Sequence, residues 1–226
     1  MEGPFFIGEV EHYRVRLDVA TSDHTTEWLI RDETLRYGLG YSTPRPFHWS
    51  DDGRHLYYTD EFVADGCALF ANGFDLYRLD LADGTSAEVV PPGAWWVSIS
   101  PDERTAAYIR WNGTLLEIVT RDIEDQQEHR AFFDPSYEQG GAIVWSPDSK
   151  HLALTLASHA CQPPDWTQAI VRIDVVTLSQ TLLFSASQPL LRTREWPDPD
   201  TILLADDIGN AWTMDANTGQ VEPSGD

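Results

Sequence analysis

One phrase recurs four times along the 226 residues, and this repeat limits the folds that the chain can adopt. In each copy an apolar residue leads into a Ser-Pro-Asp-like turn, and a short apolar run follows. The leading residues stand 50, 46 and 51 positions apart, and they are Trp49, Ile99, Trp145 and Trp196. Proline fixes φ in such a turn and Asp or Ser bonds nearby amides, so each copy predicts two short strands joined by a tight turn.

A second phrase recurs five times, out of phase with the first. Each copy is an apolar run that ends in an aspartate before a turn, and these aspartates are Asp18, Asp80, Asp122, Asp174 and Asp215. Together the two phrases predict units of two successive hairpins, which is four strands in about 45 to 50 residues. Apolar spacing at three and four residues, typical of helices, is nearly absent.

This pattern predicts an all-β fold, a β-propeller of four-stranded antiparallel blades. We expect a single domain over residues 1–226 with five blades, of which the N-terminal one is incomplete. The predicted blades are 5–31 (partial), 46–90, 95–133, 142–185 and 193–226. The alternative is that the chain is a segment of a larger ring, with the exposed sheet edge that this implies. The repeated tryptophans and strand-ending aspartates are expected to serve the blades, with tryptophan filling the wedge between neighbouring blades.

The repeated turn, best preserved as Trp145-Ser-Pro-Asp148 with an aliphatic strand after it, resembles the TolB-type β-propeller repeat. The same repeat occurs in the propellers of prolyl-oligopeptidase-like enzymes. The match is good at 143–154, weaker at 47–58 and 97–108, and decayed at 194–205, where Ser-Pro-Asp has become Pro-Asp-Pro. The resemblance covers roughly residues 10–220 and implies the propeller fold. It also implies a protein or peptide partner, as TolB-like propellers have, although one fold hosts many activities.

The charge balance limits the classes of partner that the chain is expected to bind. Lys and Arg number 15 and Asp and Glu number 37, which gives a net charge of −22. Such a field repels phosphate backbones and anionic lipid, so we expect no nucleic acid partner. No window approaches the roughly 18 apolar residues of a spanning helix, so membrane insertion is not expected. We expect a soluble monomer, cytoplasmic if the N-terminus is native and periplasmic or secreted if a signal peptide has been removed.

Catalytic motifs are missing from the sequence. There is no Gly-x-Ser-x-Gly, no Gly-x-Gly-x-x-Gly and no Gly-Lys-Ser/Thr, so no catalytic residue is assigned. His159, Cys161 and Asp165 could supply metal ligands, but the spacing is unusual for zinc and we expect an ordinary loop. No metal ligand and no cofactor are predicted, with Ca²⁺ as the alternative discussed below. Whether Cys67 and Cys161 pair is left open.

Aromatic and acidic residues gather in the loops that should share one rim of the propeller. We predict that ligand contacts come from Tyr37, Tyr41, Asp60, Glu61, Trp111, Tyr137, Trp166, Asp206 and Asp207. Phe62, Phe70 and Trp95 fall in the same loops. Aromatic faces with interspersed carboxylates suit a peptide, a carbohydrate or a basic partner. The pairs 60–61 and 206–207 occupy equivalent points of two blades, so they could also hold Ca²⁺, or they could be solvated loop acids.

These observations predict a non-enzymatic binding or scaffold module that engages a protein, peptide or other basic or hydroxyl-rich ligand through an aromatic and acidic rim. One alternative is a carbohydrate-active or metal-assisted propeller enzyme that uses carboxylates around the central channel. Another is an accessory propeller of a catalytic domain that this sequence does not contain. A two-carboxylate mechanism would require acids that converge at the channel mouth.

Overall fold

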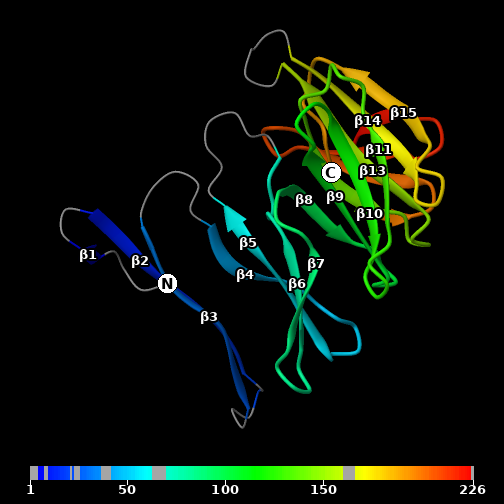
Figure 1. The fold of residues 1–226 in the computed structure, drawn as a ribbon. Coiled ribbons are helices and arrows are strands. Elements are labelled where there is room, and N and C mark those ends of the chain that lie inside the picture. The colour runs from blue at the N-terminus through cyan, green and yellow to red at the C-terminus, as the bar shows by residue number, and fades with distance from the viewer. Residues whose placement is uncertain are drawn as a thin grey trace. The chain divides into compact units, whose positions relative to one another are not determined.

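The computed structural model describes residues 5–7, 10–20, 22, 26–36, 42–62, 70–159 and 166–224. The chain forms two compact units. The N-terminal unit contains residues 1–66 and 72–92, and the C-terminal unit contains residues 67–71 and 93–226. The described residues form nineteen strands and no helix, grouped in five antiparallel sheets (Figure 1). The described residues therefore include no helix that could cross a membrane.

The N-terminal unit holds two sheets. The first has the order β1-β2-β3, built from β1 (Phe5–Ile7), β2 (Val10–Ala20) and β3 (Glu27–Arg36). The second has the order β4-β5-β6-β7, built from β4 (Ser42–Trp49), β5 (His55–Phe62), β6 (Leu76–Asp80) and β7 (Ser86–Val90). Alternate residues of β2 and β5 face a shared core of Leu17, Val19, Leu56, Tyr58 and Leu79.

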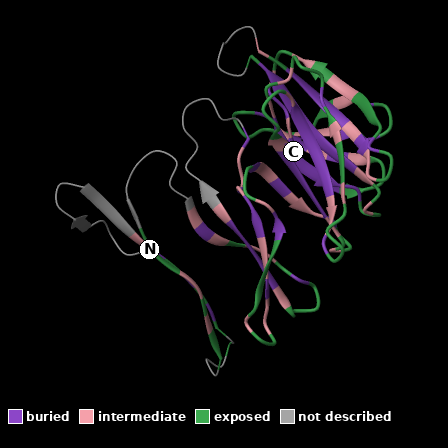
Figure 2. Cartoon of the chain, in the orientation of Figure 1, coloured by how far each residue is buried: buried purple, intermediate pink, exposed green. Residues whose placement is uncertain are grey.

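The C-terminal unit holds three four-stranded sheets. The first contains β8 (Ala94–Ile99), β9 (Thr105–Trp111), β10 (Leu116–Asp122) and β11 (Glu128–Phe132). The second contains β12 (Gln139–Trp145), β13 (His151–Ser158), β14 (Thr167–Asp174) and β15 (Gln180–Ala186). The third contains β16 (Arg192–Asp198), β17 (Thr201–Ala205), β18 (Ala211–Asp215) and β19 (Val221–Pro223). Figure 2 shows the buried residues concentrated in the strands of this unit.

The predicted fold class is confirmed. Each of the four later sheets is one sequence repeat, with its strands paired in chain order as two hairpins. The first sheet has three strands among the described residues, in keeping with the incomplete N-terminal blade. Strands β2 and β3 have 11 and 10 residues, longer than the repeat suggested. That the whole chain is a single domain stays a prediction.

The repeated tryptophans have two different environments. Trp145 and Trp196 are buried in cores shared by neighbouring sheets, and Trp145 Nε1 donates a hydrogen bond to Ser98 Oγ at 3.1 Å. Trp49, which should fill the same wedge, is 50% exposed, so that expectation is wrong at the first repeat. The core of the N-terminal unit is filled instead by Tyr58 and by Trp28, which packs against it.

The predicted turn chemistry is present in detail. Ser146 Oγ donates to Asp148 Oδ1 at 2.7 Å, and it accepts the amide of His151 at 2.9 Å. The Lys150 amide donates to the same Asp148 oxygen at 3.2 Å. The pattern repeats around Asp52 and Asp102, and these carboxylates therefore hold the turns of three sheets.

We expect Asp148→Ala to lower the free energy of unfolding by about 0.5 to 2 kcal/mol, because the turn loses a local acceptor. Urea denaturation measures this change. Lys150→Ala is the matched control, since its ion pair with Asp148 is exposed and should contribute little. An Asp148→Ala protein as stable as the wild type would show that the hydrogen bonds do not stabilise the turn.

The aspartates at the ends of β6, β10, β14 and β18 also close their own turns. Asp174 Oδ1 accepts the amides of Val176 and Thr177, and Asp215 Oδ1 accepts those of Asn217 and Thr218. These hydrogen bonds, led by that from the Thr177 amide for Asp174 and from the Thr218 amide for Asp215, hold the pKa of each carboxyl below its usual range. The Asp174 and Asp215 carboxylates are therefore ionised in the folded chain at neutral pH.

This pKa difference predicts acid sensitivity. A carboxyl whose folded pKa is lowered stabilises the fold above its unfolded pKa of about 4, and that contribution is lost as pH falls through the folded pKa. Urea midpoints in high salt, which screens the excess negative charge, should be level from pH 7 to about pH 5 and fall below pH 4. The fall should be smaller for Asp174→Ala. Equal midpoints at pH 7 and pH 2.5 would contradict the assignment.

Candidate functional site

Connections of one kind lie together at one end of the C-terminal unit. Each sheet pairs the start of its first strand with the end of its second, as in Ala94 with Arg110 and Arg192 with Ala205. Strand β12 lies between β8 and β16, and the amide of Leu191 donates to Gln168 Oε1 across the sheet boundary at 2.8 Å. We call this end the loop rim; it comprises the described residues 111–115, 133–138, 159, 166, 187–191 and 206–210.

The opposite end of the unit carries the tight turns. The amide of Asp102 donates to Ser149 Oγ at 3.2 Å, which joins the turns of two neighbouring sheets. We call this the turn end, and it comprises residues 100–104, 122–127, 146–150, 174–179, 198–200 and 215–220. The loop rim therefore has irregular connections of variable length, whereas the turn end repeats two hydrogen-bonded turn types, each with an aspartate acceptor.

Three predicted aromatic residues lie on the loop rim. Trp111 is the last residue of β9 and is 42% exposed. Tyr137 is partly buried against the core of the unit, and burial, followed by the nearby Asp134, raises its pKa. Trp166 directly precedes β14 and is half-buried. The strand registers therefore bring these three side chains to one end of the unit, and Trp111 is the most accessible of them. That they contact a ligand stays a prediction.

The rim carboxylates Asp206 and Asp207 have different environments. Asp206 is buried and accepts hydrogen bonds from the amides of Ile208 and Asn210, from Asn210 Nδ2 and from Trp212 Nε1. Burial opposes ionisation, but these hydrogen bonds outweigh it and lower the pKa of Asp206. Asp206 therefore closes its own turn. Asp207 is exposed, and Ile208 beside it is 81% exposed.

The remaining predicted residues belong to the N-terminal unit. Asp60 lies within β5 and not in a loop, because that strand runs on to Phe62. Both of its carboxylate oxygens accept from Arg31 Nη1 at 2.5 Å. Its amide donates to Asp75 Oδ1 at 2.8 Å. Burial raises the pKa of Asp75, a carboxyl that the sequence analysis did not single out. The predicted Asp60–Glu61 loop is therefore a strand with its first carboxylate held internally.

Several predictions fall outside the described residues. They concern Tyr37 and Tyr41, the side chain of Glu61, and the thiols Cys67 and Cys161. The suggested ligand set of His159, Cys161 and Asp165 shares this limit, since only His159 is described. Within the described residues, no three His, Cys, Asp or Glu side chains are grouped so that they could hold a metal ion.

Phe70 is a correction to the predicted rim, because it is fully buried rather than displayed. It packs with Ala142 and Ala157, and Trp96 lies against the same cluster. A Cβ atom added at Gly141 would lie 2.6 Å from Phe70 Cβ, so only glycine leaves room for this ring. The pair Gly140-Gly141 was the sequence signal for such a close approach, and the sequence analysis did not use it.

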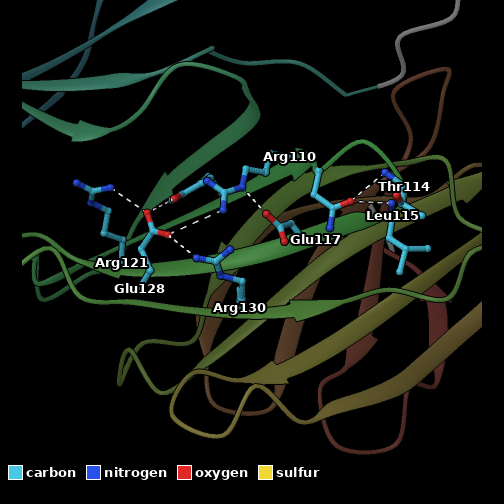
Figure 3. Close-up of polar contacts among 9 residues, drawn as sticks. Arg110, Thr114, Leu115, Glu117, Arg121, Glu128 and Arg130 are labelled. Atoms are coloured by element: carbon cyan, nitrogen blue, oxygen red, sulfur yellow. Dashed lines mark hydrogen bonds and ion pairs between the residues drawn. The ribbon is translucent and has the colours of Figure 1, made fainter.

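A charged network that the sequence did not reveal covers one face of the sheet β8–β11 (Figure 3). Arg110 donates to Glu117, which is only 1% exposed. Glu128 accepts from Tyr108 at 2.8 Å and from Arg121 at 2.9 Å, with Arg130 3.5 Å away. Burial raises the pKa of Glu128, and these hydrogen bonds outweigh it, so its pKa is lowered overall.

The network lies on this face because successive side chains of a strand point to opposite faces of the sheet. Ala107, Ile109, Leu116 and Ile118 point from the same strands into the core shared with β12–β15. The intervening residues Tyr108, Arg110 and Glu117 must therefore occupy the other face. Arg110 and Glu117 are cross-strand partners in the β9–β10 register, and this register is what brings an arginine to a buried carboxylate.

Known structures share this fold. No family model matches the chain, and no curated protein matches it in sequence. Oligogalacturonate lyase from Vibrio parahaemolyticus aligns with a TM-score of 0.62 at 15% identity, over 96% of this chain and 61% of the lyase. TolB from Acinetobacter baumannii aligns with a TM-score of 0.55 at 18% identity, over 77% of this chain and 42% of TolB.

A structure of a nidogen/laminin complex aligns with a TM-score of 0.54 at 12% identity, over 94% of this chain and 74% of that one. The chain thus spans about three fifths of the length of the lyase and less than half that of the TolB protein. At these identities the likeness concerns the fold alone. The sequence repeat, the five antiparallel sheets and these structures agree, and the chain has a TolB-like β-propeller fold.

Proposed function

We propose that the chain is a binding or scaffold module that holds a basic or hydroxyl-rich protein or peptide on its loop rim, as a soluble monomer without catalytic residues of its own. The observation that supports this most is the pair of accessible apolar side chains on the rim, Trp111 and Ile208. Apolar side chains on firmly held loops are the usual anchors of protein interfaces. Tyr37 and Tyr41, in the N-terminal unit, stay predicted ligand contacts.

The preference for a basic partner follows from charge. The net charge of −22 attracts cations over the screening distance, about 8 Å at physiological ionic strength. On the rim, Asp207 and Glu138 are exposed and add to this field locally. Asp206 has a supporting role, because its four hydrogen bonds fix the turn that presents Asp207 and Ile208. A prearranged turn loses less conformational entropy when it binds.

The protein class of the partner is supported by comparison. The nidogen/laminin structure is that of a complex between two proteins, and its propeller aligns with nearly the whole of this chain. The TolB likeness implies a partner of the same class, as the sequence repeat did. Carbohydrate is the second ligand class, since tryptophan faces and carboxylates also suit sugars.

The alternative function is that of an enzyme acting on carbohydrate, suggested by the likeness to oligogalacturonate lyase. A polyuronate is an anionic chain, and the net charge of −22 repels it. Two of the predicted carboxylates already have structural partners, since Asp206 closes its own turn and Asp60 forms an ion pair with Arg31. Incubation with oligogalacturonate and Mn²⁺, followed by assay for unsaturated product, tests this alternative, and product formation would favour it over the binding role.

The binding role is tested by selection from a random peptide library displayed on phage, with the immobilised chain as bait. We expect enriched peptides to carry basic residues and to bind less tightly as salt rises. Trp111→Ser and Ile208→Ser should each weaken binding while leaving the melting temperature unchanged. Leu182→Ser is the matched control, since Leu182 is exposed on β15, away from the rim. Peptides that bind both rim variants as tightly as the wild type would overturn the proposal.

A further inference from the structure

A groove at the turn end of the C-terminal unit forms a second surface, separate from the loop rim. Its volume is about 380 Å³, and it lies between the β10–β11 turn of one sheet and the β14–β15 turn of the next. Asp122, Asp125 and His129 line the first side, and Val175 and Val176 line the second, with threonine and glutamine side chains between them.

The apolar side of the groove is held in a fixed position. Val176 is 80% exposed, although valine side chains are ordinarily buried. Its backbone amide donates to Asp174 Oδ1, and the Thr177 amide and hydroxyl donate to the same atom. The turn therefore cannot withdraw Val176 from solvent without losing hydrogen bonds, and the groove keeps one apolar wall.

The other side carries negative charge that is also fixed. Asp122 Oδ1 accepts the amides of Glu124 and Asp125, and the Asp125 carboxylate accepts the amide of Gln127. Backbone hydrogen bonds, led by that from Asp125, hold the pKa of Asp122 below its usual range, so it is ionised at neutral pH. Two carboxylates held by backbone amides and the exposed Val176 thus line one groove, and its volume of about 380 Å³ could hold one long side chain.

We infer that this groove binds a lysine or arginine side chain of a basic partner segment. Such a side chain has an apolar stem and a cationic tip, which match the valine wall and the aspartate wall respectively. The inference goes beyond the loop rim, because the groove lies at the opposite end of the same unit. A partner that carries basic residues in an extended segment could therefore contact the chain at two separate surfaces.

The test uses fluorescence anisotropy with a labelled peptide of five Gly-Lys repeats and four variants of the full chain. Val176→Ser removes the apolar wall without changing charge, and Asp125→Asn removes one carboxylate. Their matched controls are Leu182→Ser, an exposed apolar position on β15 outside the groove, and Asp83→Asn, the equivalent turn position after β6. We expect Val176→Ser and Asp125→Asn each to weaken binding about threefold to fivefold, and the controls to change it less than twofold.

Each other outcome is decisive. Unchanged affinity in Val176→Ser would show that the peptide responds only to the overall negative charge, and it would contradict the inference that the groove binds a basic side chain. Equal weakening in Leu182→Ser would show that loss of any exposed apolar side chain reduces the affinity, and it would contradict the groove assignment. Failure of the wild type to bind this peptide would also overturn the groove, while the rim would still be judged by the phage selection. Melting temperatures equal to that of the wild type establish that the variants are folded.

Discussion

Replacing Trp145 with alanine is expected to lower the free energy of unfolding by about 3 to 5 kcal/mol. Its indole is buried between the sheets β8–β11 and β12–β15, and truncation leaves a cavity that the facing strands cannot fill. The Ser98 hydroxyl also loses its hydrogen bond from Nε1. Urea denaturation followed by far-ultraviolet circular dichroism measures the change.

Trp49→Ala is the matched control, because Trp49 holds the same repeat position and is half exposed. Its loss should cost about 1 kcal/mol or less, in proportion to the smaller apolar area that it buries. An equal loss of unfolding free energy in the two variants would contradict this account, in which the contribution of the repeated tryptophan depends on how far neighbouring strands bury it.

Replacing Arg110 with methionine is expected to cost about 3 to 5 kcal/mol, because it leaves the buried Glu117 carboxylate without its cation. The Arg110→Met/Glu117→Leu double variant should recover most of that loss, since an apolar pair of similar volume needs no charge compensation. Urea midpoints of the wild type, both single variants and the double variant measure the coupling.

The outcome that would contradict this assignment is an Arg110→Met protein within 1 kcal/mol of the wild type. It would mean that Glu117 reaches water or another cation. Arg130→Met is the control for general loss of positive charge, because Arg130 belongs to the same network (Figure 3) with more than half of its side chain exposed.

The turns and sheets could be predicted because their causes are local. Ser146 and Asp148 specify their turn through hydrogen bonds that span at most five residues, and the same two residue types recur in three of the four repeats. Repeated local chemistry is therefore visible in a single sequence. The decayed copy behaves likewise, since Asp198 still accepts the amides of Asp200 and Thr201.

Side-chain environments were less predictable because they depend on partners distant in the sequence. Phe70 looked like a rim aromatic, but Gly141, 71 residues away, gives it a buried place. Asp60 looked like a loop acid, but the length of β5 and the position of Arg31 make it half of an ion pair. Asp206 lies on the loop rim, but its role in closing the turn depends on Asn210 and Trp212.

The exposed residues of the rim could be predicted in part, in position but not in exposure. Their position followed from the strand order, since the connections after the second strand of each sheet share one end with those before the first. Their exposure did not follow, because Trp111 is accessible whereas Tyr137 is packed against the core. Among the described rim residues, Trp111 and Ile208 are therefore the exposed large apolar side chains, and the sequence did not single out Ile208.

Amide hydrogen exchange of the chain, alone and with the tightest peptide from the phage selection, tests the binding role of the loop rim most directly. The peptide should slow exchange at rim residues 112–115, 136–138 and 207–210, because the bound segment covers these connections and excludes water. Turn residues at 100–104 and 146–150 should exchange at the same rate in both samples. Protection that spares all three rim segments would contradict the account.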